Sequence, residues 1–291
     1  MPAPVFPIRL LALDIDGTLV GPDLGLRDRT VDAIRAAVHR GVSVSLVTGR
    51  MASSARDFAE VLGLTEPIVA HQGAVIRAMP EPGSRSPGRL LRHTPLAADV
   101  ARDALAWSRR RGLDPHINNL ERLVIRSDDP RAEDYSAFLG VRAVLAPDLV
   151  AWVTHPVTKI IAVADAPLPV DSLLPGRQAF SGRATVTVSH PRYLEFVAPG
   201  VTKGRAVHWL ARRAGVPLAQ AMAIGDQYGD IEMIAAVGHG VAMAGAPDPV
   251  QAAARYVAPS LEEEGAAAMI ERLVLHRAPP AHRAPPAHRA G

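Results

Sequence analysis

The chain has 291 residues, 48% of them hydrophobic, so it can bury a core large enough for one large or two smaller domains. It contains no cysteine, which excludes disulfides, thiolate metal sites and cysteine nucleophiles. The formal net charge is only +3 and no dense basic run with interleaved aromatic residues occurs, which argues against nucleic acid as a partner. Arg9 and Asp14 leave the N-terminal apolar stretch too short for a signal peptide or a membrane span. We therefore expect a cytoplasmic protein without a membrane partner.

From residue 8 to about residue 80, apolar runs alternate with amphipathic segments. Strands are predicted over Ile8–Leu13, Val42–Val47 and Pro67–Ala70, with helices over Asp28–Arg40 and from the residues after Arg50 to about Leu62. This alternation is typical of parallel βαβ units.

The pattern changes between about residues 82 and 196. A loop rich in Pro, Gly and Ser (Pro80–Gly88) is predicted as a linker, and a helix follows over Leu96–Arg111. Short strand-like runs come next at Leu120–Arg126, Val141–Leu145, Val150–Val153, Lys159–Ala164 and Ala184–Ser189. This mixture of short elements indicates an inserted α+β domain.

The βα pattern then resumes, with helices predicted over Thr202–Ala214 and Asp230–Ala236 and strands over Ala221–Ile224 and Gly240–Met243. We therefore predict an α/β core domain over residues 1–81 and 197–275, interrupted by an α+β domain over residues 82–196. From His276 the chain repeats His-Arg-Ala-Pro-Pro-Ala, and residues 276–291 are predicted to form a disordered tail.

Four segments carry side chains that are suited to chemistry, and the first is Asp14-Ile15-Asp16-Gly17-Thr18. Here an apolar strand stops abruptly on two carboxylates. In open α/β sheets, ligands bind in the crevice at the carboxyl ends of the strands, and Gly17 lets the backbone turn tightly beside a ligand. An acidic turn that simply ends a strand is the alternative interpretation.

Thr48 forms the second segment, because it follows a buried strand and opens a predicted helix. Its hydroxyl and the helix N-terminal amides favour an anion, although a helix N-cap uses the same amides. Lys203 lies in the third segment, at the predicted start of a helix, where a positive charge opposes the macrodipole. Lys159 and Lys203 are the only lysines in an arginine-rich chain, so we interpret Lys203 as the partner of an anion.

The fourth segment is Gly225-Asp226-Gln227-Tyr228-Gly229-Asp230, where an apolar strand again ends in carboxylates. The four-residue spacing places Asp226 and Asp230 on one side of the next helix. Asp230 either takes part directly or merely favours the N-terminus of that helix.

Together these side chains supply what phosphoryl transfer through an aspartyl intermediate requires. A carboxylate nucleophile attacks phosphorus while the phosphoryl oxygens are neutralised. Clustered acids without a cation would repel each other and raise each other's pKa values. Mg²⁺ prefers hard oxygen ligands and keeps some of its waters, so a few carboxylates suffice to bind it. We therefore expect Mg²⁺ as a cofactor.

The set Asp14-x-Asp16-Gly-Thr, Thr48-Gly-Arg50, Lys203 and Gly-Asp226-x-x-x-Asp230 resembles the haloacid dehalogenase (HAD) superfamily. The insert resembles the class IIB cap of Cof-like phosphatases, and the resemblance covers roughly residues 8–275. It implies an α/β fold in which a HAD-like Rossmannoid parallel sheet forms the core and an inserted α+β cap domain covers the site.

The resemblance also implies a role for each of the predicted site residues. Asp14 would be the nucleophile and Asp16 the general acid/base, while Thr48 and Lys203 would hold the phosphoryl group. The carboxylates of Asp14 and Asp226 and the backbone carbonyl of Asp16 would bind Mg²⁺, which Asp230 would support from a helix. An acid at position 16 favours a phosphatase or mutase over a dehalogenase, because halide leaves without a proton.

Two positions depart from the family's pattern. Gly229 stands where an asparagine often precedes the last acid, and Gln72, in His71-Gln72-Gly73, stands where the family often has another asparagine. Neither change removes the nucleophile, the acid, the lysine or the metal ligands, so we expect activity to survive.

The expected reaction is Mg²⁺-dependent hydrolysis of a small phosphomonoester, with sugar phosphates as the first candidates by family analogy. Five residues of the insert are candidates for contacting the leaving group: Lys159, His116, Asn118, Asn119 and His190. The alternative for each is a packing or surface role. A phosphosugar mutase and a non-catalytic phosphoester-binding protein with this fold are the alternative functions.

Overall fold

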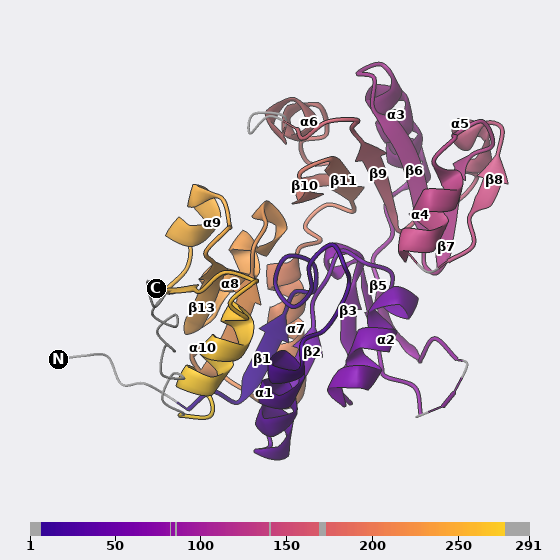
Figure 1. The fold of residues 1–291 in the computed structure, drawn as a ribbon. Coiled ribbons are helices and arrows are strands. Elements are labelled where there is room, and N and C mark those ends of the chain that lie inside the picture. Colours follow the sequence, from indigo (N-terminus) through magenta and orange to yellow (C-terminus); the bar gives the residue numbers. More distant parts are fainter. Residues whose placement is uncertain (1–6, 82, 85, 140, 169–172, 277–291) are drawn as a thin grey trace, which may run out of the picture.

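The computed structural model describes residues 7–81, 83–84, 86–139, 141–168 and 173–276. The predicted disordered tail lies outside these residues, apart from His276. Among the described residues, the strands form one sheet of five strands, one of six and one of three (Figure 1). No helix within them is long and apolar enough to cross a membrane.

The five-stranded sheet is parallel throughout and positions the acidic segments. Its order is β14 (Tyr256–Ala258), β13 (His239–Met243), β12 (Ala221–Gly225), β1 (Leu10–Leu13) and β2 (Ser43–Leu46). Asp14 and Asp226 directly follow β1 and β12, which are neighbours paired from Leu10↔Ala221 to Leu13↔Ile224. The two carboxylates therefore leave the sheet side by side, at its carboxyl edge.

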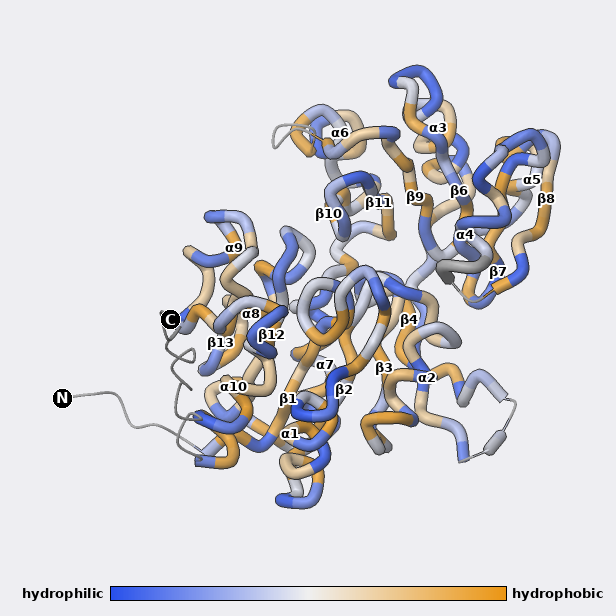
Figure 2. The backbone as a smooth tube through the Cα atoms, viewed as in Figure 1, coloured by the Kyte–Doolittle hydropathy of each residue, from blue (hydrophilic) through white to orange (hydrophobic). Residues whose placement is uncertain are grey.

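Helices cover both faces of this sheet. One layer contains α1 (Asp28–His39), α2 (Ala52–Leu62) and α10 (Gly265–Leu273), and the other contains α7 (Lys203–Ala214), α8 (Ile231–Ala236) and α9 (Asp248–Ala252). Alternate residues of β1 serve the two layers, since Leu11 and Leu13 pack into the first apolar cluster while Leu10 and Ala12 pack into the second. Figure 2 shows this apolar run as orange tube between the helices. Burial on both faces explains why the strand sequence is apolar without alternation.

A three-stranded antiparallel sheet extends this part of the molecule. It contains β3 (Ile68–Ala70), β4 (Val75–Arg77) and β5 (Leu90–His93), and a parallel bridge between Val47 and Val69 joins it to the end of β2. The predicted linker Pro80–Gly88 therefore connects two paired strands. Because β5 pairs with β4, strand pairing favours a start of the inserted domain after His93 rather than at residue 82, and we keep the two-domain division as a proposal.

The six-stranded sheet is built from the intervening residues and lies above the carboxyl edge of the five-stranded sheet in Figure 1. Its order is β10 (Thr185–His190), β11 (Tyr193–Val197), β9 (Lys159–Val163), β6 (Asp114–Asn119), β7 (Arg122–Arg126) and β8 (Val144–Ala146). The accompanying helices are α3 (Ala98–Arg109), α4 (Ala132–Leu139), α5 (Leu149–Trp152) and α6 (Leu173–Ala179). Single 3-10 turns η1 (His71–Gly73), η3 (Leu218–Gln220) and η4 (Tyr228–Asp230) lie elsewhere in the chain.

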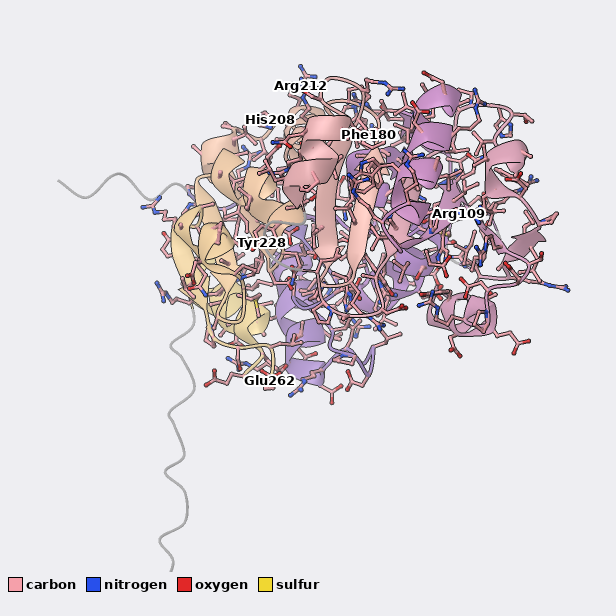
Figure 3. The ribbon with its side chains drawn as sticks, turned by 90° about the horizontal axis from the view of Figure 1, so that it is seen from above. Arg109, Phe180, His208, Arg212, Tyr228 and Glu262 are labelled. Carbon is pink, nitrogen blue, oxygen red and sulfur yellow. The ribbon has the colours of Figure 1, made fainter. Side chains whose placement is uncertain are left out.

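Aromatic residues hold the six-stranded sheet to its helices. The rings of Trp107, Phe180 and Phe196 meet edge to face, with centroids 5.0–6.0 Å apart. In the view from above, Phe180 lies over this sheet whereas Arg212 of α7 points outward, in agreement with their buried and exposed positions (Figure 3).

Several sequence predictions need correction. Val150–Val153 is not a strand but part of the helical turn α5, because the Asp148 carboxylate accepts hydrogen bonds from the amides of Val150 and Ala151 and caps that turn. The strands β4, β5, β6, β11 and β14 and the helices α9 and α10 were not predicted. Most of these strands are antiparallel or at a sheet edge, and their residues mix polar and apolar types.

Candidate active site

The turn after β1 fits closely around the end of β12. Gly17 has φ +76°, and its amide donates to the Val20 carbonyl at 2.9 Å. A Cβ atom at position 17 would overlap the Asp226 carboxylate, so the turn requires glycine for its conformation and for its space. The Thr18 hydroxyl donates to Asp226 Oδ1 at 3.2 Å. The first and fourth motifs are therefore in direct contact.

Lys203 lies at the centre of the acidic cluster. It is the first residue of α7 and is buried, and its Nζ lies 2.8 Å from Asp14 Oδ1 and 2.7 Å from Asp230 Oδ1. Burial lowers the pKa of Lys203, but the two carboxylates more than offset this and raise it above its usual value. These carboxylates also compensate the unfavourable position of a cation at a helix N-terminus.

Asp230 serves as a connector within the cluster. While its Oδ1 faces Lys203, its Oδ2 accepts hydrogen bonds from the amides of Asp226 at 3.0 Å and Gln227 at 2.9 Å. The side chain of Gln227 completes a capping box around η4. Asp230 therefore closes a helical turn and also contacts Lys203, while its direct part in the chemistry stays a prediction.

Asp14 and Asp226 are carboxylates held in a nearly dry environment. Burial, reinforced by neighbouring Asp230, raises the pKa of Asp226 to about 7. Burial also raises the pKa of Asp14 well above its usual range, although Lys203 opposes this shift. Oxygens of Asp14, Asp226 and Asp230 lie within 4.8 Å of one another. Such a set of hard donors fits a small divalent cation, which would favour the ionised carboxylates.

Asp16 points away from this cluster and toward Arg50. The Arg50 guanidinium binds it as a fork, with Nε donating to Oδ2 at 2.8 Å and Nη2 donating to Oδ1 at 2.5 Å. The Asp16 side chain is 40% exposed whereas that of Arg50 is 5% exposed, so the arginine is fixed and the acid faces the opening. The sequence pattern contained Arg50 but assigned no role to it.

Thr48 is fully buried in the loop between β2 and α2. Its hydroxyl accepts a hydrogen bond from the Arg50 amide at 3.1 Å, and its amide donates to the Val69 carbonyl at 2.9 Å. Helix α2 begins only at Ala52, with Met51 as its N-cap, so the alternative interpretation of Thr48 as a helix cap is excluded, while its contact with a phosphoryl group stays a prediction. Thr48 instead shapes the loop whose next residues, Gly49 and Arg50, line the main pocket.

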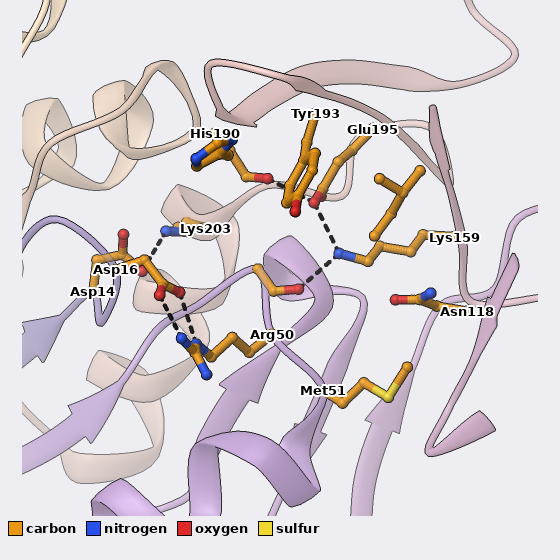
Figure 4. Close-up of a pocket in the computed structure, with 13 residues that line it drawn as sticks. Asp14, Asp16, Arg50, Met51, Asn118, Lys159, His190, Tyr193, Glu195 and Lys203 are labelled. Atoms are coloured by element: carbon orange, nitrogen blue, oxygen red, sulfur yellow. Dashed lines mark hydrogen bonds and ion pairs between the residues drawn. The ribbon is translucent and has the colours of Figure 1, made fainter. Parts of the chain in front are cut away.

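That pocket has two walls (Figure 4). The acid wall consists of Asp14, Asp16 and Lys203 with the loop Gly49–Met51. The strand wall comes from the six-stranded sheet and comprises Asn118, Lys159, Ile161, Ser189, His190, Tyr193 and Glu195. Both lysines of the chain therefore line one pocket, one on each wall.

A buried ion pair organises the strand wall. Lys159 Nζ donates to Glu195 Oε1 at 3.0 Å and to the Gly49 carbonyl at 2.7 Å, so it also bridges the two walls. Ser189 donates to the same Glu195 oxygen at 2.7 Å. Glu195 Oε2 and Asn118 Nδ2 are both buried and have no hydrogen-bond partner within the part of the chain that the structure describes. Unmatched polar atoms beside a pocket are suited to a polar ligand.

The structure divides the five residues predicted to contact a leaving group. Lys159, Asn118 and His190 line the pocket. His116 instead lies 3.4 Å from Asp129 and packs against the Tyr135 ring, while Asn119 contacts His155, so both belong to other clusters. Nothing in the sequence marks Glu195, Ser189 or Tyr193 as pocket residues. The only signal is indirect, because Glu195 pairs with Lys159, which is one of only two lysines in the chain.

Comparisons with known proteins identify the family of the chain. The profile of the haloacid dehalogenase-like hydrolases matches residues 11–270. The chain is 32% identical to an HMP-PP phosphatase of Cronobacter sakazakii, covering 82% of this chain and 85% of that protein. It is 28% identical to an HMP-PP phosphatase of Escherichia coli O6:H1, covering 84% and 87%.

Among solved structures, a haloacid dehalogenase-like hydrolase from Bacteroides thetaiotaomicron is similar, with a TM-score of 0.74 and 26% identity. The similarity covers 91% of this chain and 99% of that one. The matched residues include both walls of the pocket and the four segments that contain Asp14, Thr48, Lys203 and Asp226. The chain therefore belongs to the haloacid dehalogenase-like hydrolases.

Proposed function

We propose that this hydrolase, a phosphatase of the haloacid dehalogenase superfamily, uses Mg²⁺ to hydrolyse small phosphomonoesters through an aspartyl-phosphate intermediate. The observation that carries the proposal is the contact of Lys203 with Asp14 at the edge of the sheet. A buried carboxylate beside a fixed ammonium provides a nucleophile together with a partner for the phosphoryl oxygens.

In the first step, an Asp14 oxygen attacks phosphorus and the bond from phosphorus to the leaving-group oxygen breaks. Lys203 and the loop at Thr48 hold the phosphoryl oxygens, and Asp16 gives its proton to the departing oxygen. In the second step, Asp16 removes a proton from water, the hydroxide attacks phosphorus, and the bond to Asp14 breaks. Orthophosphate leaves, and Asp14 is restored as a carboxylate.

Arg50 controls the position of Asp16 in this scheme. Because the guanidinium occupies both carboxylate oxygens, Asp16 has to turn away from Arg50 and take up a proton from water before it can protonate the leaving group. Its partial exposure leaves room for that rotation. Arg50 therefore keeps the acid at the mouth of the pocket until a substrate enters.

The carboxylates of Asp14 and Asp226 with the backbone carbonyl of Asp16 would hold Mg²⁺. Bound there, the ion would neutralise phosphoryl charge and align the ester with the nucleophile. Asp230 does not act as a ligand in this proposal, because Lys203 and two backbone amides already occupy its oxygens.

The strand wall supports a polar, uncharged leaving group. Glu195 accepts N–H or O–H donors, Lys159 and Asn118 supply donors, and Ile161 adds apolar surface that Met51 continues from the acid wall. Sugar phosphates fit this set of groups, and HMP-PP is the second substrate to test because two of the similar proteins carry that name.

The decisive experiment measures free phosphate released from sugar phosphates, nucleotides, cofactor phosphates and HMP-PP, with Mg²⁺ and with EDTA. Metal-dependent release that Asp14→Asn abolishes is the expected result. Transfer of phosphate to a second sugar position without release would indicate a phosphosugar mutase. No turnover of any ester would favour a non-catalytic phosphoester-binding protein.

A further inference from the structure

Gln72 occupies a special backbone position next to the active site. It lies in η1, between β3 and β4, with φ +60°, which is uncommon for a residue other than glycine. Its amide donates to the Thr48 carbonyl at 3.0 Å, so the backbone ties it to the loop that carries the predicted phosphoryl contacts. The residue is only 2% exposed.

The carboxamide of Gln72 is buried without a partner at either end. Neither Nε2 nor Oε1 makes a hydrogen bond with the described residues. A buried amide that lacks partners keeps the full cost of its removal from water. An apolar side chain of the same length would avoid this cost, so filling space does not explain a glutamine here.

Two glycines create the slot in which this side chain lies. A Cβ atom at Gly49 would stand 2.6 Å from Gln72 Nε2, and a Cβ atom at Gly229 would stand 3.2 Å from Gln72 Oε1. Gly49 adjoins Thr48, and Gly229 adjoins Asp230. The two positions at which the sequence departs from its family's pattern, 72 and 229, are therefore in contact.

The slot opens beside the catalytic lysine. Gln72, Thr187, Lys203 and Gly229 line a recess, and Lys203 also lines the main pocket between the two walls. Gly49 also lines the main pocket, so the Gln72 carboxamide lies between a residue of that pocket and the recess that it shares with Lys203. Carboxamide N–H groups are good donors to phosphoryl oxygens.

We propose that Gln72 is a phosphoryl-binding residue that donates a hydrogen bond from Nε2 to a phosphoryl oxygen held by Lys203. The proposal rests on the proposed function, because it assigns the anion at Lys203 as a phosphoryl group. The longer glutamine side chain reaches over the surface that Gly229 leaves bare and supplies a polar contact that position 229 lacks.

The test compares the wild type with Gln72→Met, which keeps length and removes both polar atoms. Orthophosphate binding is measured by calorimetry in the presence of Mg²⁺, together with the melting temperature. We expect the affinity for orthophosphate to fall about tenfold, in line with the loss of one hydrogen bond to a charged group. The melting temperature should stay equal or rise, because two unpaired buried polar atoms are gone.

A purely structural role predicts the opposite pattern, and unchanged orthophosphate binding in Gln72→Met would overturn the proposal. Gln178→Met, at an exposed position of α6, is the matched control and should bind as the wild type does. Gly229→Asn should also weaken binding because it displaces Gln72, and the double variant Gln72→Asn/Gly229→Asn should recover most of that loss. No recovery would contradict the proposed contact between the two positions.

Orthophosphate binding requires no turnover, so the two proposals fail separately. A wild type that binds orthophosphate through Gln72 but hydrolyses no ester would retain this inference and refute the hydrolase mechanism. Turnover of esters with no effect of Gln72→Met on binding or on kcat/KM would do the reverse. A wild type that binds no orthophosphate at millimolar concentration would overturn the role of Gln72.

Discussion

The acid wall and the strand wall of the pocket are built in different ways. On the acid wall, key side chains follow the end of a buried parallel strand or begin a helix, as Asp14 and Lys203 do, and Asp226 follows the neighbouring strand beside them. On the strand wall, side chains come from alternate positions of antiparallel strands, as Lys159 and Glu195 do. The first arrangement leaves a recognisable motif in the sequence, and the second leaves none.

This difference leads us to expect the catalytic step on the acid wall and the choice of substrate on the strand wall. Parallel strands fix the direction of the residues that follow them, so the acid wall tolerates little change. A residue facing the pocket from an antiparallel strand can be replaced without moving its neighbours. Substitutions on the acid wall should therefore abolish turnover of every ester, whereas those on the strand wall should change which ester is preferred.

The largest expected effect comes from the two acids of the first motif. Asp14→Asn should reduce kcat about 10⁴-fold or more because the amide is a poor nucleophile. Asp16→Asn should reduce it roughly 10²–10⁴-fold through loss of proton transfer. Phosphate release is the measurement, and circular dichroism is the control for folding. Nearly full activity of Asp16→Asn would refute its assignment as the acid/base.

Lys203 tests whether the acid wall is also a structural unit. Lys203→Met leaves Asp14 and Asp230 buried without their counter-charge, which should lower the free energy of unfolding by about 3–5 kcal/mol. Urea denaturation measures this loss. Adding Asp230→Asn should recover part of it, and a double variant as unstable as the single one would refute the coupling. Orthophosphate should bind weakly to both variants.

Glu195 tests the selectivity assigned to the strand wall. Glu195→Gln keeps the shape but weakens the contacts to Lys159 and Ser189. We expect KM for a sugar phosphate to rise about tenfold. KM for methyl phosphate, whose methyl group is too small to reach this wall, should stay unchanged. An equal loss of kcat for both esters would place Glu195 in the chemistry and remove the distinction between the walls.

The smallest effect on turnover is expected at His71, which is fully buried and lines none of the pockets described. Burial, reinforced by Lys159, lowers the pKa of His71 well below 6.5. The unfolded chain takes up a proton below that pH and the folded chain does not, so stability should fall on acidification by about 1.4 kcal/mol per pH unit. His71→Asn, which tolerates the positive φ at this position, should lose that part of the slope in denaturation curves at pH 5–7.

The sequence predicted the parallel sheet and the acid wall well because both depend on short, local patterns. Asp14, Lys203 and Asp226 directly adjoin predicted strands and helices, so their meeting follows from the βα order alone. The contact of Arg50 with Asp16 depends on side-chain rotation, which no spacing specifies. The helix that follows Thr48 begins only at Ala52, too far along the chain for Thr48 to cap it. The sequence left that cap open as an alternative, because the start of a helix is hard to locate from sequence to within a few residues.

The strand wall was hidden for a different reason. Glu195 and Tyr193 occupy alternate positions of β11 and read as an ordinary amphipathic strand, so nothing marks them as pocket residues. Val150–Val153 contains two valines that favour strand, yet the Asp148 side chain closes a helical turn there. In both places, contacts that are distant or involve single side chains decide the outcome.

The pairing of β1 with β12 has a consequence for how the protein is made. Leu10 lies next to Ala221 in the finished sheet, so more than two-thirds of the chain must leave the ribosome before the two strands can meet. Contacts of such high sequence separation form slowly, whereas the six-stranded sheet lies entirely between them and can pair earlier. The nascent chain therefore carries Asp14 long before Lys203 and Asp226 have been made, and the acid cluster can assemble only after Asp230 has left the ribosome.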